Sequence, residues 1–138
     1  EAFRLQQAIY TCTKEWPKEE TYALTDQIRR SSRSVGANLA EAWAKRRYPA
    51  HFLSKLTDAD GELAETRHWL STAAACGYLV EGAAIEVSQH ADCVGRLLGA
   101  MLLSKDAIGE AVEIVHEADF YRPAHQTIYG TILDAKPS

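Results

Sequence analysis

The chain has 138 residues, of which 46% are hydrophobic and 25% charged, and its net charge is −4 at pH 7. This length and balance suit one compact globular domain and exclude a chain that is disordered throughout. The sequence has no N-terminal signal core and no apolar run approaching the roughly 20 residues that span a bilayer. We therefore expect a cytoplasmic protein without a membrane partner.

The first two predicted helices lie on either side of Pro17. In the first, apolar residues recur at spacings of 3, 4, 3 and 4, which keeps them on one seam facing a partner helix. The seam residues are Ala2, Leu5, Ile9, Cys12 and Trp16. The second helix is expected from about residue 21 until shortly before Pro49. Its seam consists of Ile28, Ser32, Val35, Leu39 and Ala42.

Small residues thin the middle of the second helix. They are Ser31, Ser32, Ser34, Gly36 and Ala37. Gly36 alone costs about 1 kcal/mol of helix propensity relative to alanine. We therefore expect a neighbouring helix to approach closely at this point.

The third and fourth predicted helices keep the same period. The third follows Pro49 and ends at Gly77, a residue suited to a helix C-terminal cap. Its seam residues are Phe52, Leu56, Ala59, Leu63, Thr66, Leu70 and Ala73. The fourth helix ends where Lys105 breaks the pattern. Its seam residues are Val80, Ala84, Val87, Ala91, Val94, Leu98 and Met101.

Four helices with one 3.5-residue period and short connections predict an all-α fold. The expected architecture is an antiparallel, up-down-up-down, left-handed four-helix bundle. We assign residues 1–103 to the bundle. A polar break at residues 104–106 precedes two further short helical patterns, so residues 104–138 are predicted to form a helical appendage.

Seven large apolar residues lie beside the seams. In an isolated bundle several of them would stay partly exposed, although burying each is worth about 1.5–3 kcal/mol. They therefore predict a surface for self-association, and the alternative is a broader core face on each helix. The predicted interface residues are Phe3, Tyr10, Trp43, Leu53, Trp69, Ile85 and Leu97.

Positive charge is concentrated between residues 29 and 47. This segment holds six basic residues and one acid, which gives it a charge of +5 and leaves −9 for the remainder. The basic residues are Arg29, Arg30, Arg33, Lys45, Arg46 and Arg47. They predict a surface that binds the phosphate backbone of RNA or DNA. The alternative is a solvated face paired with acids, with cations placed at a helix C-terminus.

Motifs for catalysis or metal binding are not supported. Two Glu-x-x-His pairs, Glu65/His68 and Glu113/His116, are typical of di-iron bundles. The heptad register turns the first pair outward, and the second lies beyond the bundle. The three cysteines form no C-x-x-C pair and are expected to be reduced. Phosphate-loop, dinucleotide, zinc-protease and nucleophile-elbow motifs are missing from the sequence. We predict a non-catalytic protein without a metal or cofactor.

Residues 16–32, which contain Q-I-R-R, and residues 34–42, which contain N-L-A-E-A, strongly resemble one family of four-helix bundles. It is named for proteins encoded in 23S ribosomal RNA intervening sequences. The segments G-Y-L at 77–79 and V-G-R-L-L-G-A-M at 94–101 fit it too, so the resemblance covers about residues 1–101. The resemblance implies a cyclic homopentamer. A relative in diversity-generating retroelements engages a reverse transcriptase and nucleic acid.

A second resemblance begins where the first ends. Residues 99–108 and 118–129 are similar to the N-terminal helical domain of bacterial replicative DNA helicases, and the likeness lapses near residue 134. The chain therefore reads as a natural or engineered fusion joined near residues 98–101.

Together these features predict a homo-oligomeric, nucleic-acid-associated accessory or adaptor protein. The alternative is a protein-binding or structural scaffold without affinity for nucleic acid, which presents its appended helices to a protein partner.

Overall fold

The computed structural model describes residues 1–104, which form four α-helices and no strand. The α-helices are α1 (Ala2–Thr13), α2 (Asp26–Ala44), α3 (Pro49–Ala75) and α4 (Glu81–Leu103). A 3-10 turn, η1 (Lys18–Glu20), and a π-helical turn, η2 (Thr21–Thr25), lead into α2. The prediction of an all-α four-helix bundle is confirmed. Apart from Ser104, the predicted appendage at 104–138 lies outside the described residues.

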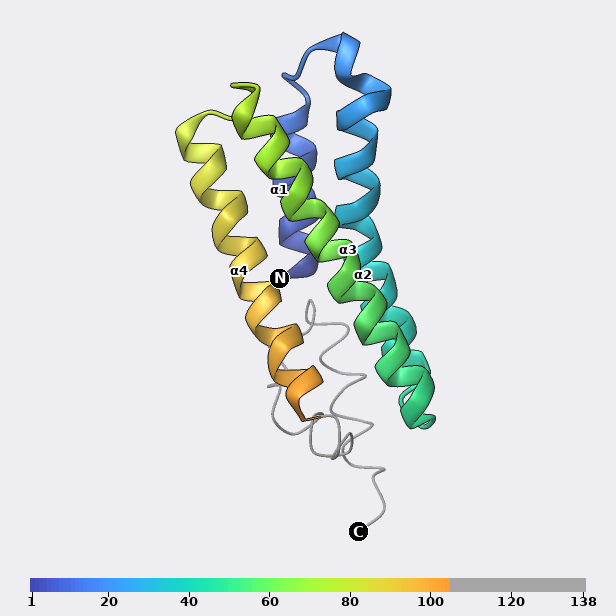
Figure 1. Ribbon diagram of the computed structural model, residues 1–138. Coiled ribbons are helices and arrows are strands. Elements are labelled where there is room, and N and C mark those ends of the chain that lie inside the picture. The colour runs from blue at the N-terminus through green and yellow to red at the C-terminus, as the bar shows by residue number, and fades with distance from the viewer. Residues whose placement is uncertain (105–138) are drawn as a thin grey trace.

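The helices differ in length, and this shapes the bundle. In Figure 1 the chain reverses direction at each connection, and α2 lies along α3. Helix α1 contacts α2 and α4, and α4 also contacts α3. With 12 residues against 27, α1 is about 18 Å long and α3 about 40 Å. The connection between α2 and α3 therefore extends beyond the N-terminal end of α1 (Figure 1).

The core is built from the predicted seams. Each helix contributes fully buried side chains, including Leu5, Ile28, Leu56 and Leu98, all at most 1% exposed. Val80 is an exception: it is 72% exposed because α4 begins only at the next residue. In the part of the chain that the structure describes, no helix is long and apolar enough to cross a membrane.

A small polar layer joins α2 to α3 inside the core. The hydroxyl oxygen of Thr66 lies 2.9 Å from that of Ser31, and both residues are fully buried. Ser31 also donates to the carbonyl oxygen of Ile28 at 3.2 Å. The close helix approach therefore lies at Ser31. Ser31 belongs to the stretch of small residues where close approach was expected. At Gly36, in the same stretch, a Cβ would lie 3.9 Å from its nearest neighbours, an ordinary contact.

Two helix ends follow local chemistry. Helix α1 stops at Thr13, three residues before the predicted end. Pro17 has no N–H and cannot form the next helical hydrogen bond, to the carbonyl of Thr13. Trp16 is nevertheless buried, with its ring 6.1 Å from that of Tyr78. At the end of α3, Gly77 has a φ of 77°, and the Tyr78 amide donates to the carbonyl of Ala73. This is a Schellman cap, which requires the left-handed conformation that glycine adopts readily.

Candidate nucleic-acid interface

Three cations surround the ring of Tyr10 between α1 and α2. The charged groups of Lys14, Arg29 and Arg33 lie 4.8, 4.9 and 5.6 Å from the ring centroid. Tyr10 and Lys14 are four residues apart on one helix, as are Arg29 and Arg33 on the next, so the two rows face each other. Arg29 also donates from Nε to the hydroxyl of Thr13 at 2.8 Å. We call these four residues, Tyr10, Lys14, Arg29 and Arg33, the Tyr10 cluster.

Arg30 belongs to a different surface. Its guanidinium faces α3 and pairs with Glu65 at 2.5 Å and Glu62 at 3.5 Å. The hydrogen bond from Arg30 holds the pKa of Glu65 below its usual range, whereas burial raises the pKa of Glu62. The positive charge of Arg30 is therefore neutralised within the bundle.

The remaining predicted cations lie at the connection between α2 and α3. Arg46 stacks on Trp43, 5.3 Å from the ring centroid, and donates to the Trp43 carbonyl at 3.0 Å. Burial, together with the neighbouring Arg47, lowers the pKa of Arg46. Arg47 and Tyr48 are exposed. We call the segment 45–51 the hairpin tip.

The six predicted cations thus form three groups instead of one. Sixteen residues separate Arg29 from Lys45, which corresponds to about 24 Å along α2. The structure brings Arg29 and Arg33 together, keeps Lys45, Arg46 and Arg47 at the tip, and turns Arg30 toward α3. It also adds Lys14, which lies over the same Tyr10 ring as Arg29 and Arg33 but precedes the basic segment 29–47 in the sequence.

The seven predicted interface residues differ in exposure. Phe3 is 41% exposed and Ile85 is 51% exposed. The other five, Tyr10, Trp43, Leu53, Trp69 and Leu97, are half-buried. Trp69 and Leu97 pack against the core, which agrees with the alternative of broad core faces for these two residues.

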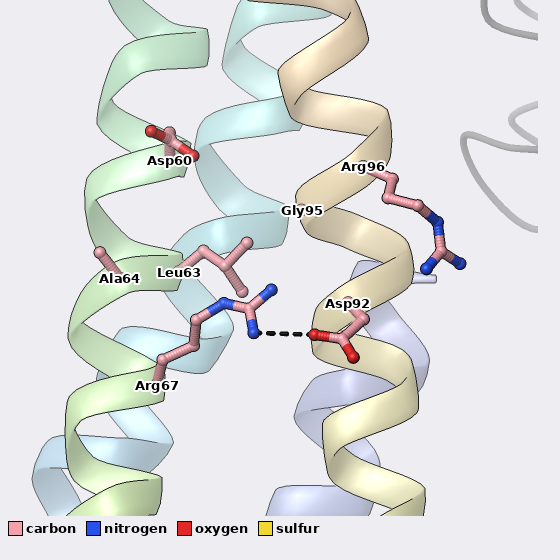
Figure 2. Close-up of a pocket in the computed structure, with 7 residues that line it drawn as sticks. All are labelled: Asp60, Leu63, Ala64, Arg67, Asp92, Gly95 and Arg96. Atoms are coloured by element: carbon pink, nitrogen blue, oxygen red, sulfur yellow. Dashed lines mark hydrogen bonds and ion pairs between the residues drawn. The ribbon is translucent and has the colours of Figure 1, made fainter.

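An open cleft of about 410 Å³ lies between α3 and α4. Figure 2 shows Arg67 reaching from α3 toward Asp92 on α4, while Arg96 points away. Arg67 donates to Asp92 at 2.9 Å and to the carbonyl of Ala91 at 3.0 Å. A Cβ on Gly95 would lie 2.8 Å from the Arg67 guanidinium, so this glycine leaves space for the arginine. The cleft therefore holds a structural ion pair.

The residues considered for metal binding in the sequence make contacts within the bundle. Glu65 binds Arg30, and the His68 ring lies edge-on to Trp69, with centroids 5.0 Å apart. His116 and Glu113 lie outside the described residues. Across residues 1–104, no group of three or more His, Cys, Asp or Glu side chains could hold a metal ion. The cysteines Cys12, Cys76 and Cys93 are free thiols.

Comparison with known proteins identifies the bundle. Residues 1–100 match the family described as 23S rRNA-intervening sequence protein, which is well over half of the chain. The chain belongs to this family. The matched residues run from α1 through most of α4.

A second match overlaps the first. Residues 88–137 match the DnaB-like helicase N terminal domain. The replicative DNA helicase DnaB of Mycobacterium leprae (strain TN) is 60% identical over 38 residues, 28% of this chain and 6% of the helicase. The replicative DNA helicase DnaB of Leifsonia xyli subsp. xyli (strain CTCB07) is 56% identical over 36 residues, which are 26% of this chain and 8% of the helicase. The chain therefore spans less than a tenth of either helicase. No solved structure matches the chain.

The overlap of the two matches lies inside one helix. Residues 88–100 belong to both, and all of them are part of α4. The helicase-like match begins eleven residues before Gly99, where the sequence resemblance was placed. Val94 and Leu98, which are buried in the bundle core, thus lie within both matches.

Proposed function

We propose that this 23S rRNA-intervening sequence family member is a non-catalytic, homo-oligomeric accessory or adaptor protein that binds nucleic acid. Its binding residues are Lys14, Arg29, Arg33, Lys45, Arg46 and Arg47. The oligomer expected from the family resemblance is a pentamer, whose repeated copies would sum these charges.

The observation that carries the proposal is the pairing state of the cations. Within residues 1–104, Arg30, Lys55 and Arg67 form ion pairs with carboxylates. The six proposed binding residues form none in that range and lie against aromatic rings, hydroxyls or solvent. Such cations can neutralise backbone phosphates and release the counterions condensed on them.

The proposed non-catalytic role is supported by how the polar side chains are used. The ion pairs of Arg30 with Glu65 and of Arg67 with Asp92 join neighbouring helices. The buried hydroxyls of Ser31 and Thr66 bond to each other. These groups are engaged in holding the bundle together.

Fluorescence anisotropy with a labelled, mixed-sequence RNA at several salt concentrations tests the proposal. Arg33, Arg47 and Lys14 are each replaced by glutamine in a separate variant. Each replacement should weaken RNA binding and make the slope of log K against log salt shallower. On a single strand the change should be about 0.7 for each phosphate that is no longer neutralised. Arg30→Gln is the matched control, because it removes an arginine that is already ion-paired. Equal losses in Arg30→Gln and in each single variant of the binding set would contradict the assignment.

A protein-binding scaffold is the second candidate. It is favoured by the helicase-like match, which runs from α4 past the end of the bundle. In that case the chain would bind no RNA or DNA at physiological salt and would capture a protein partner. Deleting residues 105–138 should then abolish the capture while leaving helices α1 to α4 folded by circular dichroism. RNA binding that survives this deletion would favour the accessory function.

A further inference from the structure

We propose that the hairpin tip is a stacking site for unpaired bases of single-stranded nucleic acid. Tyr48 supplies the stacking surface, His51 flanks it, and Lys45 and Arg47 contact the adjoining phosphates. This inference rests on the proposed function and adds the form of nucleic acid that is bound and the place where its bases lie.

The ring of Tyr48 is presented by a fixed backbone. Its amide donates to the carbonyl of Lys45, and its own carbonyl accepts from the amide of Phe52, both at 2.9 Å. Phe52 is 1% exposed and anchors this turn in the core. The Tyr48 side chain is nevertheless 65% exposed. An aromatic ring held in this way can receive a base without reordering the chain.

Other aromatic rings are less suited to this task. Three cations surround Tyr10, and Arg46 covers Trp43. Tyr22 is 83% exposed but follows Glu19 and Glu20, whose carboxylates repel a phosphate backbone. Tyr48 combines an exposed ring with neighbouring positive charge. Its edge-to-face contact with His51, at 6.0 Å between centroids, adds a second planar group at the tip.

The charge at the tip favours a phosphate ligand. No acidic residue occurs from residue 42 to residue 57, while this stretch contains four basic ones. The flanking acids Glu41 and Asp58 both pair with Lys55, at 2.9 and 3.7 Å. Lys45, Arg46 and Arg47 therefore contribute most of the local field. Figure 1 shows the connection between α2 and α3 at an extremity of the bundle.

Stacking discriminates single strands from duplexes. In a duplex the faces of internal bases are covered by their neighbours, whereas an unpaired base can lie against an aromatic side chain. Removal of one such stacking partner weakens binding by roughly 5- to 150-fold. Contacts to phosphates alone do not distinguish a single strand from a duplex in this way, because both have a phosphate backbone.

The test measures binding of the full chain to a single-stranded RNA and to its duplex by anisotropy at one salt concentration. Tyr48→Leu should weaken single-strand binding about tenfold and leave duplex binding nearly unchanged. Tyr48→Trp should retain single-strand binding, and its fluorescence should be quenched by the RNA more than that of the unaltered protein. Tyr22→Leu is the matched control and should bind as the unaltered protein does. Circular dichroism verifies the fold of each variant.

The outcomes separate the two proposals. If the protein binds RNA and Tyr48→Leu matches the unaltered protein, or loses single-strand and duplex binding equally, the stacking inference is wrong while the proposed function stands. If the unaltered protein binds neither the two RNA probes nor single-stranded and duplex DNA of the same sequence, both are overturned. Binding to vesicles containing phosphatidylserine without binding to RNA would likewise overturn both, and would assign the tip to a membrane surface.

Discussion

Neighbouring arginines on α2 have different surroundings because one residue step turns an α-helix by about 100°. Arg29 faces α1, where it bonds Thr13 and covers Tyr10. Arg30 faces α3 and its two glutamates. A count of charges along the sequence gives these residues equal weight, but only the first retains a charge without a carboxylate partner among residues 1–104.

Two glycines offer a residue-scale prediction. Gly36→Ala should stabilise the protein by up to about 1 kcal/mol, because alanine has the higher helix propensity and its Cβ would make only ordinary contacts. Gly95→Ala should stabilise the protein less, because the new Cβ would displace the Arg67 guanidinium from Asp92 and from the carbonyl of Ala91. Urea denaturation measures the free energy of unfolding of both variants. A Gly95 variant that is stabilised as much as the Gly36 variant would contradict the role assigned to Arg67.

At the scale of elements, the ion pair between α2 and α3 predicts a pH dependence. Because Arg30 lowers the pKa of Glu65 below its ordinary value of 4.5 in the folded state, the stabilisation is present above that value and is lost as the pH falls through the folded pKa. Arg30→Gln should therefore destabilise the protein at neutral pH. The pair is partly exposed, so we expect less than about 1 kcal/mol.

The raised pKa of Glu62 acts in the opposite direction. Its stabilising contribution is present below 4.5 and is lost as the pH rises through the folded pKa, so it partly offsets that of Glu65. The difference in the free energy of unfolding between Arg30→Gln and the unaltered protein should become smaller in acid. Urea denaturation at neutral pH and near pH 3 measures this difference. Arg33→Gln, which removes no ion pair within residues 1–104, should show little difference at either pH. If the loss of stability in Arg30→Gln does not change with pH, the pH dependence assigned to the ion pair of Arg30 with Glu65 is wrong.

The elements were largely predictable because a repeated apolar seam determines which side of each helix is buried. Leu5, Ile28, Leu56 and Val94 were all identified in this way. Burial of Thr13 was not, because a threonine beyond the apolar seam gives no periodic signal. The irregular turns before α2 were also missed, since 3-10 and π-helical hydrogen bonding depends on local packing that the seam pattern does not encode.

At the scale of the whole molecule, the main prediction is self-association. Light scattering should give about 77 kDa for a pentamer of the 15.3 kDa chain. Replacing Phe3 and Ile85 by glutamate should shift the mass toward that of the monomer, because both predicted interface residues are exposed in the isolated chain. Tyr22→Glu is the control, as it changes an exposed residue outside the predicted interface. A monomer without any substitution would contradict self-association.

The candidate site was less predictable than the fold. The basic residues were identified from their density in the sequence, but their division into three groups depends on which helix each one faces. Lys14 contacts Tyr10 locally, and it is the packing of α2 on α1 that brings Arg29 and Arg33 to the same ring. Tyr48 directly follows the run Lys45 to Arg47, and His51 comes three residues later, so the sequence itself places both beside positive charge. Their exposure, however, depends on how the turn is anchored by Phe52.

The unequal helix lengths have a consequence for local motion. The hairpin tip extends past α1, so its amides can exchange with solvent through an opening of the α2–α3 end that leaves the contacts of α1 intact. Amides near Ile9 and Ile28, where α1 packs on α2, should exchange only when the whole bundle opens. Opening of this end of the bundle should therefore cost a free energy well below that of global unfolding.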